Sequence, residues 1–335
     1  MKYIFGIITL CFVVGLSSCG DAIEVGENSN ISENVDSLIL QYPDSIELLL
    51  KRGNSAFESY NYTSAMSDAA KAYRLDSNNY AARLLYADLL NNRLTRSVED
   101  IMSAQRLYEG IIIKQPKNVR ALVGLASTYL FQQDYDRTFQ YANEALRINK
   151  KYRDAYVLKG TTYLILNNKE LAKSSYETAI QQDPEFYEAY FFLGQIYESE
   201  NDPLCIQYFT SAQKLQPNNL EFKYQVAYSR ETFGQYEAAK EMYREMATDT
   251  VDIYVMRALF HQGKIQQLIE NNLDSAMYFY KSALQTDPRF YEAWFNLAVC
   301  HEELGNKNQA LAAYAKCLKY NPEFEPARAR AHKLR

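Results

Sequence analysis

Two nine-residue strings in this chain are nearly identical: DPEFYEAYF at residues 183–191 and DPRFYEAWF at residues 287–295. A local sequence that recurs along a chain indicates a repeat architecture, in which each copy builds one small module that packs against the next. Each string begins with Asp-Pro and continues into an apolar, aromatic stretch. Because proline cannot continue a helix interior but is tolerated in the first turn, the strings predict the end of one helix and the start of another.

Further marks recur around these strings with a period of about 34 residues. Gly194 and Tyr197 have counterparts one period earlier at Gly160 and Tyr163. We expect small residues to let two helices approach closely and aromatic residues to fill the space between them. The small residues include Gly160, Gly194, Ala172 and Ala239, and the aromatic residues include Tyr163, Tyr197, Tyr176 and Phe209.

The pattern resembles the tetratricopeptide repeat, W-x₂-L-G-x₂-Y followed by A-x₃-F and a closing proline. In the last copy Trp294, Leu297 and Ala298 match the opening, and Pro322 matches the closing proline. The resemblance implies an all-α fold: a right-handed superhelix, or α-solenoid, of about eight helix-turn-helix repeats, each with a helix A and a helix B. We expect the repeats at residues 46–79, 80–118, 119–152, 153–186, 187–219, 220–250, 251–290 and 291–324.

The two ends of the predicted array have their own segments. Residues 33–45 are expected to form an N-terminal capping helix, and residues 325–335 a polar C-terminal capping segment. The second and seventh repeats are longer than the others, with extra residues near 91–103 and 263–275.

The first 18 residues have the character of a targeting segment. Lys2 is followed by an apolar stretch too short to span a bilayer, which is typical of a signal peptide. The sequence Leu-Ser-Ser-Cys at residues 16–19 resembles a bacterial lipobox, which implies a signal peptide at 1–18, lipid (palmitate) on Cys19 and a flexible linker over 19–32. An ordinary secretory signal with a chance cysteine is the alternative.

The lipobox resemblance implies a chain anchored by lipid in the bacterial cell envelope. Gly20 follows Cys19 where an aspartate would retain a lipoprotein in the inner membrane, so the outer membrane is favoured. The periplasmic and surface faces both stay open.

Charge and residue patterns exclude several functions. The net charge is −5, whereas a nucleic-acid-binding surface needs clustered positive charge. The three histidines, His261, His301 and His332, form no metal or catalytic motif, so we predict no enzyme, cofactor or metal. Cys205, Cys300 and Cys317 are interpreted as small buried residues, although a disulfide between Cys300 and Cys317 is conceivable.

The resemblance places the binding surface on the concave face lined by helix A. From the fourth repeat onward the second residue of each repeat is acidic, and the fifth is apolar or aromatic. Acidic residues are also favoured in a helix's first turn whatever binds, so helix chemistry is an alternative explanation. The candidate peptide-binding residues are Asp154, Val157, Glu188, Phe191, Gln195, Glu221, Tyr224, Tyr228, Asp252, Glu292 and Phe295.

These features favour a non-enzymatic, membrane-anchored adaptor or scaffold that binds a peptide or protein segment of another envelope protein. One alternative is a carbohydrate- or nutrient-binding envelope lipoprotein, since tyrosine is abundant at 29 residues. Another is a passive scaffold that stacks end to end with itself, against which the polar closing segment argues. The oligomeric state stays open.

Overall fold

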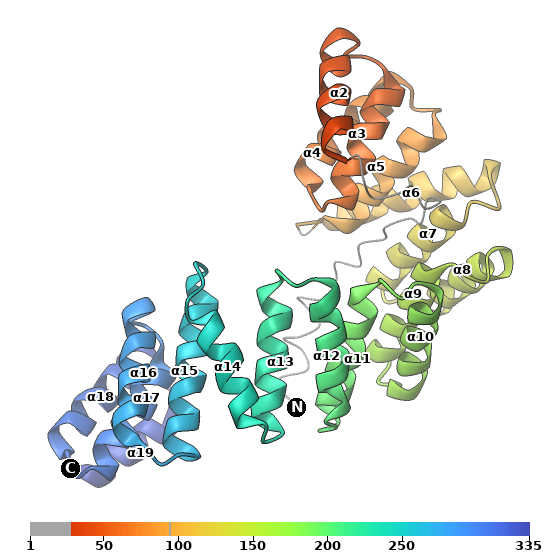
Figure 1. Ribbon diagram of the computed structural model, residues 1–335. Coiled ribbons are helices and arrows are strands. Elements are labelled where there is room, and N and C mark those ends of the chain that lie inside the picture. Colours follow the sequence, from red (N-terminus) through yellow and green to blue (C-terminus); the bar gives the residue numbers. More distant parts are fainter. Residues whose placement is uncertain (1–27, 94) are drawn as a thin grey trace. The chain divides into compact units, whose positions relative to one another are not determined.

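The computed structural model describes residues 28–93 and 95–335, with side chains from residue 35 onward. Every regular element in these ranges is an α-helix, and they contain no strand (Figure 1). The predicted signal peptide, the lipid site at Cys19 and most of the predicted linker lie outside the described residues. No helix in the described ranges is long and apolar enough to cross a membrane.

The chain divides into two compact parts, which we call the N-terminal body (Met1–Pro184) and the C-terminal body (Glu185–Arg335) and describe separately. The N-terminal body contains α2 (Asn28–Gln41), α3 (Ile46–Glu58), α4 (Tyr62–Leu75), α5 (Tyr80–Asn92), α6 (Val98–Lys114), α7 (Val119–Phe131), α8 (Tyr135–Ile148), α9 (Arg153–Ile165) and α10 (Lys169–Gln182). The C-terminal body contains α11 (Tyr187–Ser199), α12 (Leu204–Leu215), α13 (Leu220–Thr232), α14 (Tyr236–Met246), α15 (Asp252–Leu268), α16 (Leu273–Thr286), α17 (Tyr291–Glu303), α18 (Lys307–Tyr320) and α19 (Glu325–Leu334).

Helices α3 to α18 form eight consecutive pairs, four in each body, and each pair consists of a helix A and a helix B. The turn inside most pairs contains one residue with positive φ, a conformation that asparagine and glycine tolerate well. These residues are Tyr60, Gln133, Asn167, Asn201, Gly234, Asn271 and Gly305. The recurring turn explains why the pairs resemble one another although their sequences differ.

The N-terminal end differs from the prediction. Helix α2 spans residues 28–41, so it begins inside the segment expected to be a flexible linker and ends before the predicted capping helix does. Residues 42–44 form a turn, and Ser45 caps α3 with its side chain. The helix begins before residue 33, the predicted start. Residues 28–32 are mostly small and polar and therefore gave no helical pattern, but helix formation depends on the packing of the whole segment.

The two predicted insertions take different forms. In the second pair the extra residues lengthen the turn and give α6 17 residues, and α6 starts with a capping box between Ser97 and Asp100. In the seventh pair they lengthen helix A, so that α15 also has 17 residues. The insertion in the seventh pair therefore extends its helix A, α15, beyond the length of the other A helices.

In several pairs an aromatic ring of helix B packs directly against a glycine of helix A. A Cβ added at Gly194 would lie 2.5 Å from Phe209, and one added at Gly160 would lie 2.9 Å from Tyr176. No side chain larger than hydrogen fits there without displacing the ring. The expected close approach of helices at Gly160 and Gly194 is confirmed.

The fully buried tyrosines of helix B each have a hydroxyl partner on helix A of the same pair. A buried tyrosine needs such a partner because its hydroxyl loses water on folding. The bonds are Tyr108 to Asp88 (2.6 Å), Tyr176 with Thr161 (2.9 Å), Tyr243 to Glu231 (2.9 Å), Tyr280 to Gln267 (2.8 Å) and Tyr314 to Glu302 (2.5 Å). These five tyrosines and three helix A acids therefore have a structural role.

The three described cysteines, Cys205, Cys300 and Cys317, are free and buried. Burial raises the pKa of the Cys317 thiol to about 11 and that of Cys300 to about 12. Raised pKa values of this kind are typical of unreactive structural thiols. At the C-terminal end α19 buries Ala327 and Ala331 and exposes most of its polar residues.

Candidate functional site

Two of the predicted contact residues lie inside the N-terminal body. Asp154 and Val157 on α9 are 2% and 0% exposed, which corrects the expectation that they offer contacts at the surface. Asp154 is buried because Arg153 donates to it from Nε at 2.8 Å. Burial raises the pKa of Asp154 to about 6, although the Arg153 guanidinium acts in the opposite direction.

The aromatic residues at the fifth positions of α11 and α17 pack between neighbouring helices. The Phe191 ring lies 5.5 Å from that of Phe209 and 4.9 Å from that of Phe222. The Phe295 ring lies 5.2 Å from that of Phe324. These half-buried rings therefore bury apolar area between repeats. Glu188, Gln195 and Glu292, on the same two helices, are half-buried as well.

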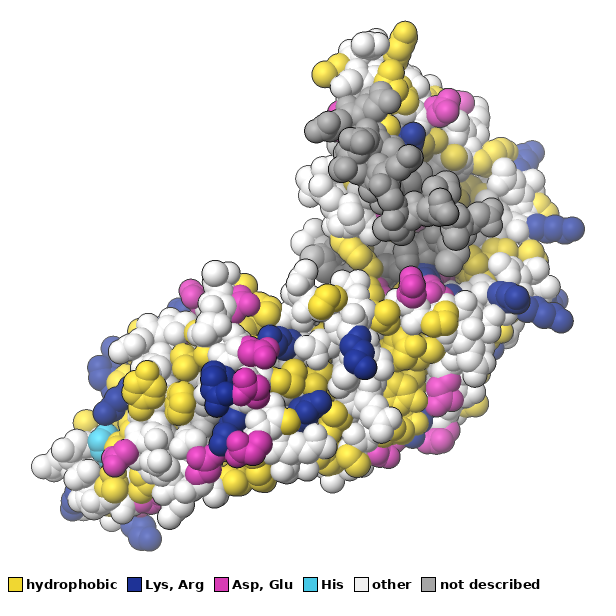
Figure 2. All heavy atoms as spheres, viewed as in Figure 1, with side chains coloured by type: hydrophobic (Ala, Val, Ile, Leu, Met, Phe, Trp, Pro, Cys, Tyr) yellow, Lys and Arg dark blue, Asp and Glu magenta, His cyan; other side chains and the backbone are white. Residues whose placement is uncertain are grey.

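The acidic residues predicted at the second positions of the repeats are only partly exposed. Glu221 accepts a hydrogen bond from the Tyr254 hydroxyl at 2.9 Å, which ties α13 to α15, whereas Asp252 is exposed. Both residues lie in the first turn of their helices, where the helix dipole favours a negative charge. Figure 2 shows charges of both signs mixed with apolar side chains on the visible face of the C-terminal body.

A polar cluster in the C-terminal body connects α13, α14 and α15 around His261. The imidazole is 6% exposed and has partners at both nitrogens. Nδ1 lies 2.6 Å from Oε2 of Glu231, and because a carboxylate can only accept, Nδ1 carries the hydrogen and donates it. Nε2 lies 3.0 Å from the Tyr224 hydroxyl, with which it shares a hydrogen bond. Both ring nitrogens are therefore engaged by neighbouring side chains, and the ring is buried.

Glu231 is the centre of this cluster. Besides His261, it accepts from the Tyr243 hydroxyl at 2.9 Å and from Nζ of Lys264 at 3.0 Å. Burial alone raises the pKa of Glu231, but the hydrogen bonds and charges of His261 and Lys264 outweigh it and hold the pKa below its ordinary value. The carboxylate thus accepts hydrogen bonds from three side chains, which it holds in place.

A surface cavity of about 220 Å³ opens directly above the cluster. It is lined by Tyr228, Glu231, Thr232, Tyr236, Lys264, Ile265, Leu268 and Ile269. Three of its apolar side chains are unusually exposed: Leu268 at 67%, Ile269 at 48% and Tyr228 at 37%. We call these three residues the Tyr228 patch. Large apolar side chains gathered at a concave site are typical of a place where another apolar group binds.

Other chemistry has little support in this part of the protein. Within the described ranges no three histidine, cysteine, aspartate or glutamate side chains are grouped so that they could hold a metal ion. The cavity offers one ammonium, one carboxylate that already accepts three hydrogen bonds, two tyrosines, one threonine and aliphatic walls. Such a lining suits recognition of an apolar side chain with a few polar contacts.

Models of the tetratricopeptide repeat match residues 93–153, 154–186 and 267–334. The chain contains tetratricopeptide repeats. Relatives at low identity include tetratricopeptide repeat protein 6 of Homo sapiens, 22% identical over 57% of this chain and 37% of the relative. Another is anaphase-promoting complex subunit 3 of Schizosaccharomyces pombe, 23% identical over 56% of this chain and 28% of that protein.

Solved structures show the same fold. The anaphase-promoting complex hetero-tetramer Cut9–Hcn1 matches with a TM-score of 0.55 and 14% identity, over 92% of this chain and 60% of that chain. The human IFIT1 dimer with m7Gppp-AAAA matches with a TM-score of 0.55 and 16% identity, over 88% of this chain and 77% of that chain. The chain spans between a quarter and a half of the curated relatives that it matches. These likenesses establish the fold and do not name a ligand.

The site lies between the sixth and seventh tetratricopeptide repeats. The sequence predicted Tyr224 and Tyr228 from their places in helix A, and the structure brings them together with His261 and Glu231. It did not predict Lys264, Leu268 or Ile269 as site residues. Their signal was the length of the seventh repeat, whose added turn of α15 carries Leu268 and is followed by Ile269.

Proposed function

We propose that this protein is a non-enzymatic interaction scaffold, anchored by lipid on Cys19 to a bacterial envelope membrane, that binds a peptide or protein segment of another envelope protein. Tetratricopeptide repeat proteins are generally scaffolds for protein interactions, and this chain contains the repeats. The observation that carries the binding proposal is the Tyr228 patch, which exposes three large apolar side chains over a cavity with a rigid floor.

The rigid floor supports a binding role for the patch. Tyr228 lies with its ring 6.1 Å from Tyr224 and 5.6 Å from His261, both of which are fixed by hydrogen bonds. Because Tyr228 packs against these two fixed side chains, it loses little conformational entropy when a ligand binds. Tyrosine is also one of the residue types that most often dominate binding energy at interfaces.

Site-specific photocross-linking tests the binding site. A benzophenone amino acid placed at Tyr228 is expected to capture a defined envelope protein in cells, and Leu268→Glu in the same chain is expected to abolish that adduct. The matched control is the same probe at Tyr278, a tyrosine that is 67% exposed on α16 in the same body. Equal capture from both positions, or capture that survives Leu268→Glu, would contradict the proposed site.

The lipid anchor needs a separate test because Cys19 lies outside the described residues. Its support is the sequence Leu-Ser-Ser-Cys directly after an apolar signal segment. Cys19→Ser is expected to prevent labelling with radioactive palmitate and to move the protein from the membrane fraction to the soluble fraction. Cys11→Ser, a change within the predicted signal peptide, should leave both unchanged. Palmitate labelling that persists in Cys19→Ser would refute the anchor.

A further inference from the structure

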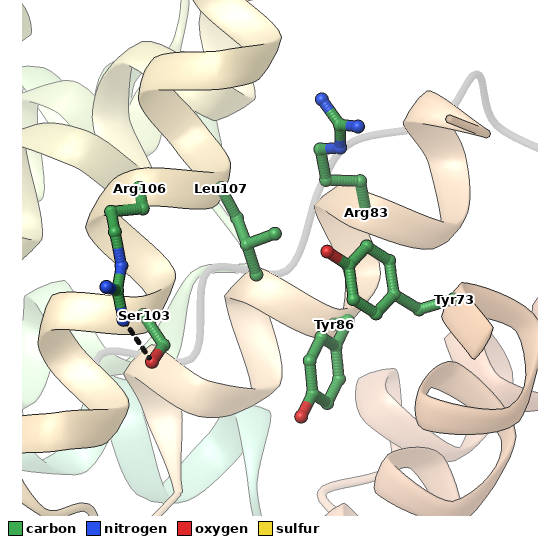
Figure 3. A pocket seen from close by; sticks show the side chains of 6 residues that line it. All are labelled: Tyr73, Arg83, Tyr86, Ser103, Arg106 and Leu107. Atoms are coloured by element: carbon green, nitrogen blue, oxygen red, sulfur yellow. Dashed lines mark hydrogen bonds between the residues drawn. The ribbon is translucent and has the colours of Figure 1, made fainter. Parts of the chain in front are cut away.

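A second concave site lies in the N-terminal body, away from the helix A positions considered above. It is a cavity of about 460 Å³ bounded by α4, α5 and α6. Figure 3 shows its lining, with Ser103, Arg106 and Leu107 on α6 facing Tyr73 of α4 and Arg83 and Tyr86 of α5. Its volume is in the range of ligand-binding clefts.

The two arginines of this cavity lack an acidic partner among the described residues. Arg83 donates from Nη2 and Nε to the Ser77 carbonyl at 2.6 and 3.2 Å, and Arg106 donates to Oγ of Ser103 at 3.2 Å. A guanidinium has five N–H donors, so both groups retain free donors. Elsewhere in this body, Arg52 and Arg120 are each bonded to a carboxylate. Acidic side chains outnumber basic ones in this protein, yet none pairs with Arg83 or Arg106 among the described residues. These two guanidinium groups can therefore pair with a carboxylate of a ligand.

The other wall of the cavity is apolar and aromatic. The rings of Tyr73 and Tyr86 are stacked, with centroids 5.2 Å apart and an interplanar angle of 19°. Figure 3 shows this pair across the cavity from Leu107. The two rings and the leucine can accommodate an aliphatic or aromatic side chain.

Gly110 gives independent support for the placement of Arg83. It lies inside α6, where glycine destabilises a helix by about 1 kcal/mol relative to alanine. A Cβ at this position would lie 3.3 Å from Nη1 of Arg83 and would meet nothing else within 4 Å. The glycine therefore leaves space for the guanidinium beside α6.

We propose that this cavity binds an acidic peptide segment, whose carboxylates pair with Arg83 and Arg106 while a neighbouring apolar side chain packs against Tyr73, Tyr86 and Leu107. Charge complementarity selects this ligand, since guanidinium groups match carboxylates in geometry and the walls match an apolar side chain. Two arginines in a chain of net charge −5 are too few for a polynucleotide, which needs many cationic contacts. The proposal does not depend on the Tyr228 patch, which lies in the other body.

Fluorescence anisotropy with three labelled octapeptides tests the proposal. The probe alternates glutamate with tyrosine and leucine, and the two comparison peptides replace every glutamate with glutamine or lysine. The full chain is expected to bind the glutamate peptide at least tenfold more tightly than the other two. The double variant Arg83→Gln/Arg106→Gln is expected to weaken that binding about tenfold or more. The matched control Arg147→Gln/Lys151→Gln removes the same charge at exposed positions of this body and should change binding less than twofold.

A second variant keeps the test decisive if the double variant unfolds. Ser103→Glu retains both arginines and places a carboxylate three residues before Arg106, where it competes with the peptide. It should weaken binding of the glutamate peptide by a similar factor, and circular dichroism should show intact helices. No preference for the glutamate peptide, equal losses in the cavity and control variants, or undiminished binding in folded Ser103→Glu would each overturn the proposal.

Discussion

Arg120 of α7 donates a hydrogen bond from Nε to Oδ2 of Asp88 on α5 at a distance of 2.6 Å, which joins two consecutive repeats through a buried ion pair. Asp88 is 0% exposed, and its other oxygen accepts from the Tyr108 hydroxyl. Burial raises the pKa of Asp88 against the effects of Arg120 and Tyr108. A buried carboxylate of this kind depends on keeping all its partners.

Arg120→Met should therefore destabilise the N-terminal body strongly. Removing one member of a buried pair leaves an uncompensated charge and typically lowers the free energy of unfolding by about 3–5 kcal/mol. Urea unfolding followed by far-UV circular dichroism measures the change. Asp88→Asn added to Arg120→Met should recover part of the loss. Glu170→Ala, at a side chain that is 83% exposed and paired with Lys173, should lower it by less than about 1 kcal/mol. A loss below about 1 kcal/mol in Arg120→Met would show that the Arg120–Asp88 pair is not needed for the stability of this body.

The same pair shows what the sequence could and could not predict. The period and the close helix contacts follow from local patterns, because glycines and aromatic residues recur in phase. Arg120 and Asp154, however, occupy equivalent second positions in their repeats, and the sequence predicted Asp154 to be a contact residue at the surface. Their partners, Asp88 and Arg153, lie at unequal distances along the chain, so no repeat pattern indicates which acid is buried.

The candidate site was predictable only as far as the common repeat extends. Tyr224 and Tyr228 could be assigned to helix A, because each repeat starts at a recognisable position. The exposure of Leu268 and Ile269 depends on how the added turn of α15 ends, which the length of the insertion does not determine. The three hydrogen bonds that Glu231 accepts also come from residues of α14 and α15, which the sequence of α13 does not indicate.

Gly124→Ala should destabilise the N-terminal body although alanine favours helices. A Cβ at this position would lie 2.4 Å from the Tyr108 ring, which is fully buried and has no space to move. Overpacking of this kind lowers the free energy of unfolding by about 1–3 kcal/mol. Gly110→Ala is the matched control on the adjacent helix, where only the flexible end of Arg83 is near, and it should raise stability by about 0.5–1 kcal/mol. Thermal unfolding of the two variants should shift in opposite directions, and a shift in the same direction would refute the packing argument.

Glu231→Gln should destabilise the C-terminal body in a pH-dependent way. Glutamine cannot replace the charged acceptor of His261 and Lys264, so at neutral pH the free energy of unfolding should fall by about 1.5–3 kcal/mol. The folded-state pKa of Glu231 is lowered, so its contribution is complete above the ordinary value of 4.5 and is lost as the pH falls through the folded-state pKa. Urea unfolding of this body, followed by the fluorescence of Trp294, the only tryptophan, is measured at neutral pH and below pH 4.5.

The difference between wild type and Glu231→Gln should accordingly shrink below pH 4.5. Glu237→Gln serves as the control, because Glu237 is 87% exposed and forms only a surface pair with Lys240. Its difference from wild type should stay small at every pH. A difference for Glu231→Gln that is constant with pH would mean that the carboxylate does not supply the charge that holds the cluster.

Asp154→Asn should have the opposite dependence on pH. The folded-state pKa of Asp154 is raised to about 6 from an ordinary value of 3.8, so between these values the folded protein binds more protons than the unfolded chain. Stability from this group is complete at low pH and falls as the pH rises, by about 3 kcal/mol between pH 4 and pH 7. Asparagine does not titrate, so the free energy of unfolding of Asp154→Asn should rise by about 3 kcal/mol relative to that of the wild type between pH 4 and pH 7. Urea unfolding by circular dichroism, with the exposed Asp136→Asn as control, measures this difference. A difference that narrows as the pH rises would show that Arg153 outweighs burial in setting the charge of Asp154.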